Sequence, residues 1–256
     1  MKTRVLDLGV VRVTQADRRE ALAIVEESLR DGGRHYFCFC EASLLSNVLR
    51  DPTLAYQVNG ATAVFADGVA ITTLARLRGQ RLPQRIPGPS FLPWACEYGQ
   101  ERGWRHFFYG GAPGVADKLA AELKRRYPRM EVAGTHCPPF RELTAAEWTE
   151  AKRLVRESRA QLVWVALGSP KQERWVAEHC GELDAPALLA VGAAFDFHSG
   201  TRPWAPSWLR RIGMEWAFRA LTGGGRTFRR NVRCVSIVAV HLLKEALRSL
   251  FRGNRK

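Results

Sequence analysis

The run Gln161-Leu-Val-Trp-Val-Ala-Leu167, followed at once by Gly168-Ser-Pro-Lys-Gln-Glu173, decides the fold. An uninterrupted apolar run of this length predicts a strand that is buried on both faces, as in a parallel sheet. The Gly-Ser-Pro that follows marks the end of the strand and the start of a helix, which we expect over Pro170–Cys180. The stretch therefore predicts one strand–loop–helix unit of an α/β protein.

The same alternation of apolar runs and helix-length amphipathic segments continues in both directions. It predicts a Rossmann-like, largely parallel sheet with helices on both faces, after an opening hairpin over Val5–Val13. The other expected strands are Tyr36–Cys40, Thr62–Ala66, Arg105–Tyr109, Met130–Gly134 and Ala187–Gly192. The other expected helices are Asp17–Arg30, Ser43–Leu49, Val69–Arg78, Phe91–Arg102, Val115–Arg126 and Ala145–Ser158. Thr144 with Glu147, and Ser169 with Gln172, match capping boxes.

The charge is concentrated at the end of the chain. The 256 residues carry a net charge of +14, and residues 201–256 hold eleven Arg and two Lys against Glu215 and Glu245. We therefore divide the chain into an α/β core, 1–200, and a basic appendage, 201–256. Such a segment predicts an anionic partner, which is a phosphate-bearing substrate, an acidic membrane surface or nucleic acid.

The basic segment is also amphipathic. A long helix is expected from Arg226 onward, after an aromatic run that contains Trp204, Trp208 and Trp216. Its apolar side is predicted to contain Phe228, Val232, Val235, Ala239, Leu242 and Ala246. Two interpretations remain open, because such a helix packs either on its own domain or on a membrane surface.

Cysteine usage and the amino terminus indicate a cytoplasmic protein. The six cysteines are scattered without metal-binding spacing, which is typical of reduced thiols. Charges interrupt the first thirteen residues, so we expect no secretory signal. The most apolar stretch, Val235–Leu243, is too short to span a bilayer.

Polar residues follow three of the expected strands, at the edge of the sheet where ligands bind in such folds. Asp67 follows the strand ending at Ala66 and precedes Gly68 and a helix. Either it caps that helix, or it is a general base that accepts a proton from a substrate hydroxyl.

Two further loops could contact phosphate. Gly110 and Gly111 let the backbone approach a phosphate in front of a helix, although a plain tight turn explains them equally well. Lys171 lies in a first helical turn, where a cation is unfavourable to the helix dipole, so its presence indicates a bound anion. No D-x-D occurs, which counts against a nucleotide-sugar enzyme that bridges its diphosphate with a metal. We expect no metal and no cofactor, so cationic side chains, which the basic segment supplies, would have to neutralise a leaving diphosphate instead.

Six motifs resemble, in their order, those of the WecG/TagA/CpsF glycosyltransferases. They are Phe65-Ala-Asp67-Gly-Val69, Arg85-Ile-Pro-Gly88, Phe108-Tyr-Gly-Gly111, Leu167-Gly-Ser-Pro-Lys-Gln-Glu173, Val191-Gly192 with Asp196 and Gly200, and Gly213-Met-Glu-Trp216 with Arg219. The resemblance covers nearly the whole chain. It implies an inverting, metal-independent enzyme, peripheral on the inner face of the cell membrane, that moves a sugar from a UDP-sugar to a polyprenyl-diphosphate-linked sugar.

The resemblance also implies roles for individual residues. Asp67 matches the family's proposed base, and Lys171 and Gln172 fall in its donor pocket. Arg219, Arg226 and Arg229 match basic positions of its membrane-binding appendage. The predicted substrate-binding set is Glu41, Arg85, Gly110, Gly111, Lys171, Gln172, Glu173, Asp196, Arg219, Arg226 and Arg229.

One departure concerns the acceptor side. Phe39 and Glu41 stand where the family often has Thr-x-Asn, and Ser90 stands where it often has Asp. The run Phe37-Cys-Phe-Cys-Glu-Ala-Ser43 looks like the branch that makes xanthan-type exopolysaccharides, which adds glucose to a glucose-diphosphate lipid.

We therefore expect a glycosyltransferase of exopolysaccharide assembly, with UDP-glucose favoured. The alternative within the family is an N-acetylmannosamine-type transferase. From other classes, a basic nucleic-acid-binding protein is disfavoured because the loop motifs would be idle, and a nicotinamide-dependent oxidoreductase because the glycine fingerprint is missing. We expect no nucleic-acid partner, and the sequence leaves homo-oligomerisation open.

Overall fold

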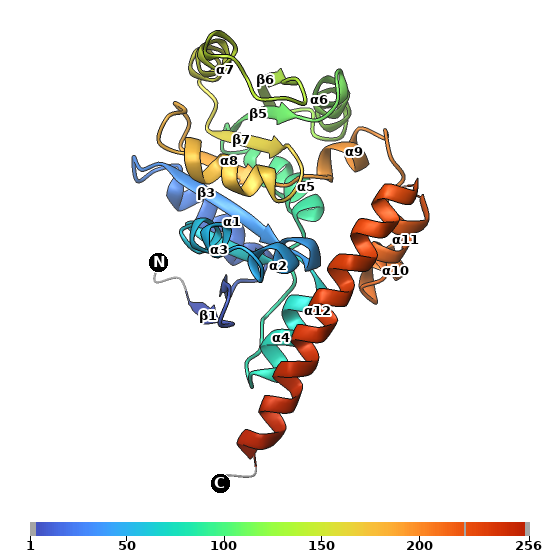
Figure 1. The fold of residues 1–256 in the computed structure, drawn as a ribbon. Helices are drawn as coiled ribbons and strands as arrows, with labels where there is room; N and C mark the ends of the chain where they lie inside the picture. The colour runs from blue at the N-terminus through green and yellow to red at the C-terminus, as the bar shows by residue number, and fades with distance from the viewer. Residues whose placement is uncertain (1–3, 223, 254–256) are drawn as a thin grey trace.

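The computed structural model describes residues 4–222 and 224–253, and its centre is a six-stranded parallel sheet (Figure 1). The strands are β3 (His35–Cys40), β4 (Ala63–Ala66), β5 (Arg105–Gly110), β6 (Glu131–His136), β7 (Leu162–Ala166) and β8 (Ala187–Ala190). Their order is β4-β3-β8-β7-β5-β6, and every neighbouring pair is parallel. A separate antiparallel pair, β1 (Val5–Asp7) and β2 (Arg12–Thr14), forms the predicted hairpin. The predicted α/β fold is confirmed.

Helices cover both faces of the sheet, so that two apolar cores form (Figure 1). One core packs α2 (Ala42–Val48), α3 (Pro52–Asn59), α4 (Val69–Leu77), α7 (Ala145–Ser158) and α8 (Lys171–His179). The other packs α1 (Arg18–Ser28), α5 (Gly88–Gly99), α6 (Val115–Arg126) and α9 (Ala194–His198). β7 shows why an uninterrupted apolar run is needed, since Val163 faces the first core and Trp164 the second.

Helix starts follow the capping signals in one predicted case and depart from them in the other. Thr144 and Glu147 form the predicted capping box of α7. The capping box expected at Ser169 is wrong, because α8 begins at Lys171 with Pro170 at its N-cap and no side-chain cap bond. The Gln172 side chain instead turns inward, where its Nε2 donates to Glu173 Oε1 at 2.8 Å and to the Ala190 carbonyl at 3.2 Å.

Three helices follow the sheet and α9 along the chain: α10 (Ser207–Arg211), α11 (Glu215–Thr222) and α12 (Gly224–Gly253). α12 runs across α2 and α4 and continues beyond the body (Figure 1). Its packed face is centred on the buried Cys234, Val238 and Glu245. The predicted apolar side is therefore only partly right, since Phe228 and Val232 are about half exposed. Among the described residues, no helix is both long and apolar enough to cross a bilayer.

The buried Glu245 joins α12 to α4. Its carboxylate accepts from Arg78 Nε at 2.9 Å and from Arg248 Nη1 at 2.6 Å. Burial alone would raise the pKa of Glu245, but the two arginines outweigh burial and the pKa lies below its ordinary value. The carboxylate is therefore stabilising above the pKa of the unfolded chain, and this stabilisation is lost as the pH falls through the lower folded value.

We expect Glu245→Gln to lower the free energy of unfolding by about 1–2 kcal/mol at neutral pH, because charge-assisted bonds to Arg78 and Arg248 are weakened. Urea unfolding at neutral and acidic pH measures this, and the deficit should shrink in acid. Glu101→Gln is the matched control, since its pair with Arg129 is exposed and contributes less than about 1 kcal/mol. Equal effects of the two changes would contradict the prediction.

Candidate functional site

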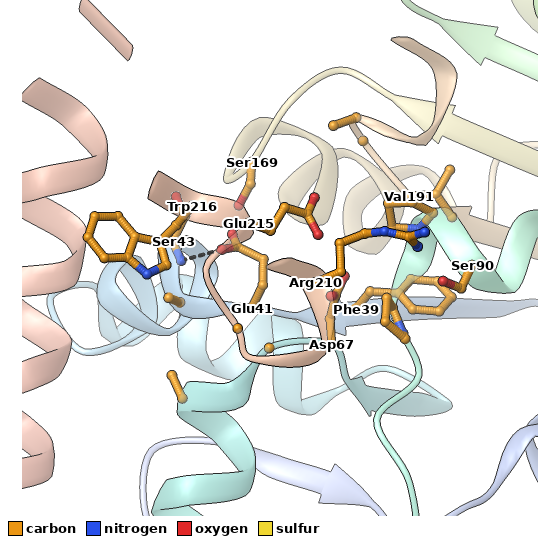
Figure 2. Close-up of a pocket in the computed structure, with 18 of the residues that line it drawn as sticks. Phe39, Glu41, Ser43, Asp67, Ser90, Ser169, Val191, Arg210, Glu215 and Trp216 are labelled. Atoms are coloured by element: carbon orange, nitrogen blue, oxygen red, sulfur yellow. Dashed lines mark hydrogen bonds between the residues drawn. The ribbon is translucent and has the colours of Figure 1, made fainter. Parts of the chain in front are cut away.

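A cavity of about 1330 Å³ opens at the carboxyl ends of the parallel strands. Its sheet side contains residues that end or follow β3, β4, β7 and β8, and α10 to α12 supply the opposite wall. In Figure 2, Asp67 lies low in the view, with Glu41, Glu215 and Ser169 on one side of it and Arg210, Ser90 and Val191 on the other. The carboxylates of Glu41 and Glu215 therefore lie on the other side of Asp67 from the Arg210 guanidinium.

Asp67 lines this cavity directly after β4. Its Oδ2 accepts a hydrogen bond from the Gly88 backbone N–H at 3.0 Å. Gly68, not Asp67, is the N-cap residue of α4, and no side chain caps that helix. The capping interpretation of Asp67 is therefore wrong, and the carboxylate is held at the cavity by the first residue of α5.

The loop that leads into α5 holds α10. Ile86 N–H donates to the Ala66 carbonyl at 2.7 Å, which fixes the loop to the end of β4. Arg85 Nη2 donates to the carbonyls of Arg210 and Arg211 at 3.1 and 3.3 Å. Arg85, predicted to bind substrate, does line the cavity, and its hydrogen bonds within the protein connect the sheet side of the cavity to the opposite wall.

Glu41 lines the cavity from the end of β3. It is the N-cap residue of α2, and its carboxylate accepts from the backbone N–H groups of Ser43 at 2.7 Å and Leu44 at 3.0 Å. These two bonds fix the carboxylate against the helix start, where the dipole also favours a negative charge.

Gln172 and Glu173 form a buried polar pair in the cavity wall, 5% and 1% exposed. Burial, with the nearby Glu41 carboxylate, raises the pKa of Glu173 to about 7, although bonds from its neighbours work in the opposite direction. Glu173 forms no ion pair with any residue that the structure describes. A carboxyl group in such surroundings holds its proton far more tightly than one in water.

The glycine loop approaches the cavity through Gly111, whose N–H donates to the Ala166 carbonyl at 2.9 Å. Gly110 ends β5 just behind it, with φ +115°. A Cβ at Gly110 would lie 2.4 Å from the Ala166 oxygen, so only glycine fits this close approach of two backbones.

Of the other residues predicted to bind substrate whose side chains the structure describes, only Asp196 lies at the cavity. Lys171 is exposed and is not among the residues that line the cavity, because the side chain at the start of α8 faces solvent. Asp196 lines the cavity and pairs with Arg202 at 3.4 Å. Arg229 is exposed, and the side chains of Arg219 and Arg226 lie outside the described part of the chain.

Arg210 and Glu215 line the cavity but were not predicted. The Arg210 guanidinium carbon lies 3.8 Å from the centre of the Trp204 ring. The sequence signal for it was only the general basic character of residues 201–256, which does not distinguish one arginine from another. Within residues 4–222 and 224–253, no group of three His, Cys, Asp or Glu side chains is placed to hold a metal ion.

The sequence of this chain is similar to those of known glycosyltransferases. Residues 6–252 match the glycosyl transferase WecG/TagA/CpsF family. Similar proteins include the N-acetylglucosaminyldiphosphoundecaprenol N-acetyl-β-D-mannosaminyltransferases of Bacillus spizizenii and Bacillus subtilis. The first is 27% identical over 178 residues, 70% of this chain and 67% of the relative, and the second is 26% identical over 164 residues, 64% and 62%.

A third such transferase, from Staphylococcus aureus, is 26% identical over 164 residues, 64% of this chain and 63% of the relative. The matched segments thus span about two thirds of each relative. Because the family match covers almost the whole chain, including every strand of the central sheet and α10 to α12 nearly to its end, this protein belongs to the WecG/TagA/CpsF family of glycosyltransferases.

Proposed function

We propose that the protein transfers a sugar, with inversion, from a UDP-sugar to a sugar linked to a polyprenyl diphosphate. The observation that carries the proposal is Asp67, a carboxylate fixed by Gly88 at the cavity, at the position where the chain matches the family's proposed base. In the reaction, the acceptor hydroxyl gives its proton to Asp67 while its oxygen bonds to the anomeric carbon. The bond between that carbon and the UDP oxygen breaks on the opposite side, and UDP leaves.

The leaving diphosphate needs positive charge where its own negative charge grows. Arg85, Arg202 and Arg210 line the cavity, and Figure 2 shows Arg210 extending away from Glu41 and Glu215. A substrate bound across the cavity would place its sugar hydroxyls near Glu41 and Glu173 and its phosphates toward the side where Arg210 lies. This orientation would leave Asp67, between the two sides, beside the reacting carbon.

The comparisons favour N-acetylmannosamine over glucose as the transferred sugar, because the named relatives are N-acetylmannosaminyltransferases. The glucose hypothesis and the exopolysaccharide role rest on Phe37–Ser43 alone. Phe39 and Glu41 of that run line the cavity, so they lie where a sugar could be selected.

A donor screen tests the proposed function. Purified protein is incubated with UDP-N-acetylmannosamine or UDP-glucose, and with synthetic polyprenyl-diphosphate-linked N-acetylglucosamine or glucose. We expect a lipid-linked disaccharide and free UDP from one matched pair, with N-acetylmannosamine and N-acetylglucosamine as the first pair to try. Failure of every pair to yield a lipid-linked product, in protein that is shown to be folded, would overturn the proposal.

We also propose that the outer side of α12 contacts the acidic inner face of the cell membrane. Val240, Leu243 and Leu247 are 53%, 61% and 48% exposed and share a helical face. The exposed Arg229 and Arg233 lie on the same side of the helix. Apolar side chains beside cations are typical of helices that lie at a membrane surface.

We expect Arg229→Gln/Arg233→Gln to bind anionic vesicles roughly 30-fold more weakly, since each cation near such a surface contributes about 1 kcal/mol. Sedimentation with phosphatidylglycerol vesicles at low salt measures this. Lys118→Gln/Arg156→Gln makes the same change in charge at exposed positions of α6 and α7, away from α12 (Figure 1). Equal binding by the two double variants would argue against α12 as the membrane contact.

A further inference from the structure

Arg210 differs from the other cations at the cavity in how it is held. Its Nε donates to the Ala205 carbonyl at 3.0 Å, and its guanidinium lies 3.8 Å from the centre of the Trp204 ring. The Trp204 ring in turn stacks on Phe197, with centroids 5.6 Å apart and planes 7° from parallel. A guanidinium stacked on a supported indole has already lost most of its rotational freedom before any ligand binds.

The backbone of Arg210 is held as well. Arg85 donates to its carbonyl, and Gly88, at the start of the helix that this loop enters, donates to Asp67. The position of Arg210 relative to Asp67 is therefore set by a short chain of hydrogen bonds. In Figure 2 its side chain extends toward Ser90 and Val191, on the side of the cavity away from Glu41 and Glu215.

The charge of Arg210 is available to a ligand. In the described part of the chain no carboxylate pairs with it, whereas Arg202 pairs with Asp196. Its Nε is occupied by Ala205, which leaves the terminal nitrogens as donors at the cavity. A planar guanidinium with two adjacent donors matches the geometry of a phosphate group.

We propose that Arg210 is the phosphate-binding residue of this cavity, and that Trp204 and Arg85 are its positioning residues. It takes the diphosphate of the sugar nucleotide, a role for which the sequence pointed to Lys171 and to the basic segment as a whole, without naming Arg210. The assignment rests on the proposed function, because it presumes a UDP-linked ligand. Arg210 would stabilise the negative charge that grows on the leaving diphosphate, from a fixed position relative to the proposed base.

Calorimetry with UDP tests this assignment. We expect Arg210→Ala to weaken UDP binding by about 30-fold, since bonds from a charged donor to phosphate are lost. Arg211→Ala is the matched control, because it removes the same charge from the neighbouring cavity-lining residue, which is exposed and unstacked. We expect a loss of less than about threefold from it.

The stacking argument has its own test. Trp204→Leu should weaken UDP binding severalfold, and adding it to Arg210→Ala should weaken binding no further, because both act through one guanidinium. Thermal unfolding without UDP shows whether each variant is folded. If Arg210→Ala is not folded, Arg210→Lys replaces it, because lysine keeps the positive charge but lacks the planar guanidinium that stacks on Trp204.

The outcomes separate the two proposals. If the wild-type protein binds UDP, and Arg210→Ala binds UDP equally well or loses no more affinity than Arg211→Ala does, the assignment of Arg210 is overturned. The proposed function is not affected by that outcome. Additive losses from Trp204→Leu and Arg210→Ala overturn the positioning role of Trp204. If the wild-type protein binds neither UDP nor a UDP-sugar, the proposed function fails with it.

Discussion

Asp67→Asn should transfer sugar on the order of 10²–10⁴-fold more slowly than the wild-type protein, with the donor saturating. The amide retains the shape of the carboxylate and its oxygen can still accept from the Gly88 N–H. It cannot take the proton of the acceptor hydroxyl. We therefore expect kcat to fall while the affinity for UDP changes little, as measured by transfer assays and calorimetry.

Asp184→Asn is the matched control, because Asp184 is an exposed carboxylate that pairs with Arg34 away from the cavity. It should transfer sugar at the full rate. Near wild-type kcat in Asp67→Asn would remove Asp67 from the mechanism. Loss of UDP affinity in step with kcat would instead assign Asp67 to donor binding.

Glu173→Gln should raise the free energy of unfolding by about 3 kcal/mol at mildly alkaline pH. The pKa of Glu173 is raised from 4.5 to about 7 in the folded protein. Folding is therefore penalised once the pH exceeds the unfolded value, and the penalty grows until the folded group also ionises near pH 7. A neutral amide avoids this penalty and still accepts from Gln172.

Urea unfolding across the pH range measures the effect of Glu173→Gln. The gain over the wild-type protein should be small near pH 4.5, rise toward pH 7 and then level off. Glu178→Gln, at an exposed position of the same helix, should show no such rise. A gain that is absent, or that is equally large in acid, would contradict a buried carboxyl with a raised pKa.

The sheet was predictable because its signal is local. Each central strand is a short apolar run that must be buried on both faces, and β7 is buried over all five residues. The capping box of α7 was equally visible in the sequence. Helix α3 was not predicted, although Asp51 caps it and Pro52 begins it, because its eight residues bury only Leu54 and Val58 and so give little periodic pattern.

The short helices α9 and α10 could not be predicted in the same way. Each has five residues, which is too few for a periodic pattern, and each is held by contacts from elsewhere in the chain. His198 of α9, for example, makes a hydrogen bond to the Pro89 carbonyl, and Arg85 donates to the end of α10. Such contacts exist only after the sheet has formed.

The same division applies to the cavity. Glu41, Asp67 and Gln172 could be placed together in advance, because parallel strands end at one edge of a sheet. The cations were assigned to Lys171 and to the basic segment in general. A sequence shows that Lys171 is in a first helical turn but not that its side chain faces solvent. Arg210 depends on its stacking with Trp204, six positions earlier, which no periodic pattern encodes.

The bonds from Arg85 to α10 also bear on how the protein is made. A chain emerging from the ribosome can pair its strands and bury most of both cores once β8 has been synthesised, since the last of the six strands ends at Ala190. Residues 202–242 provide the opposite wall of the cavity, and they emerge afterward. The nascent protein can thus form its sheet before its cavity has an opposite wall, and the cavity is completed only after residues 202–242 have emerged.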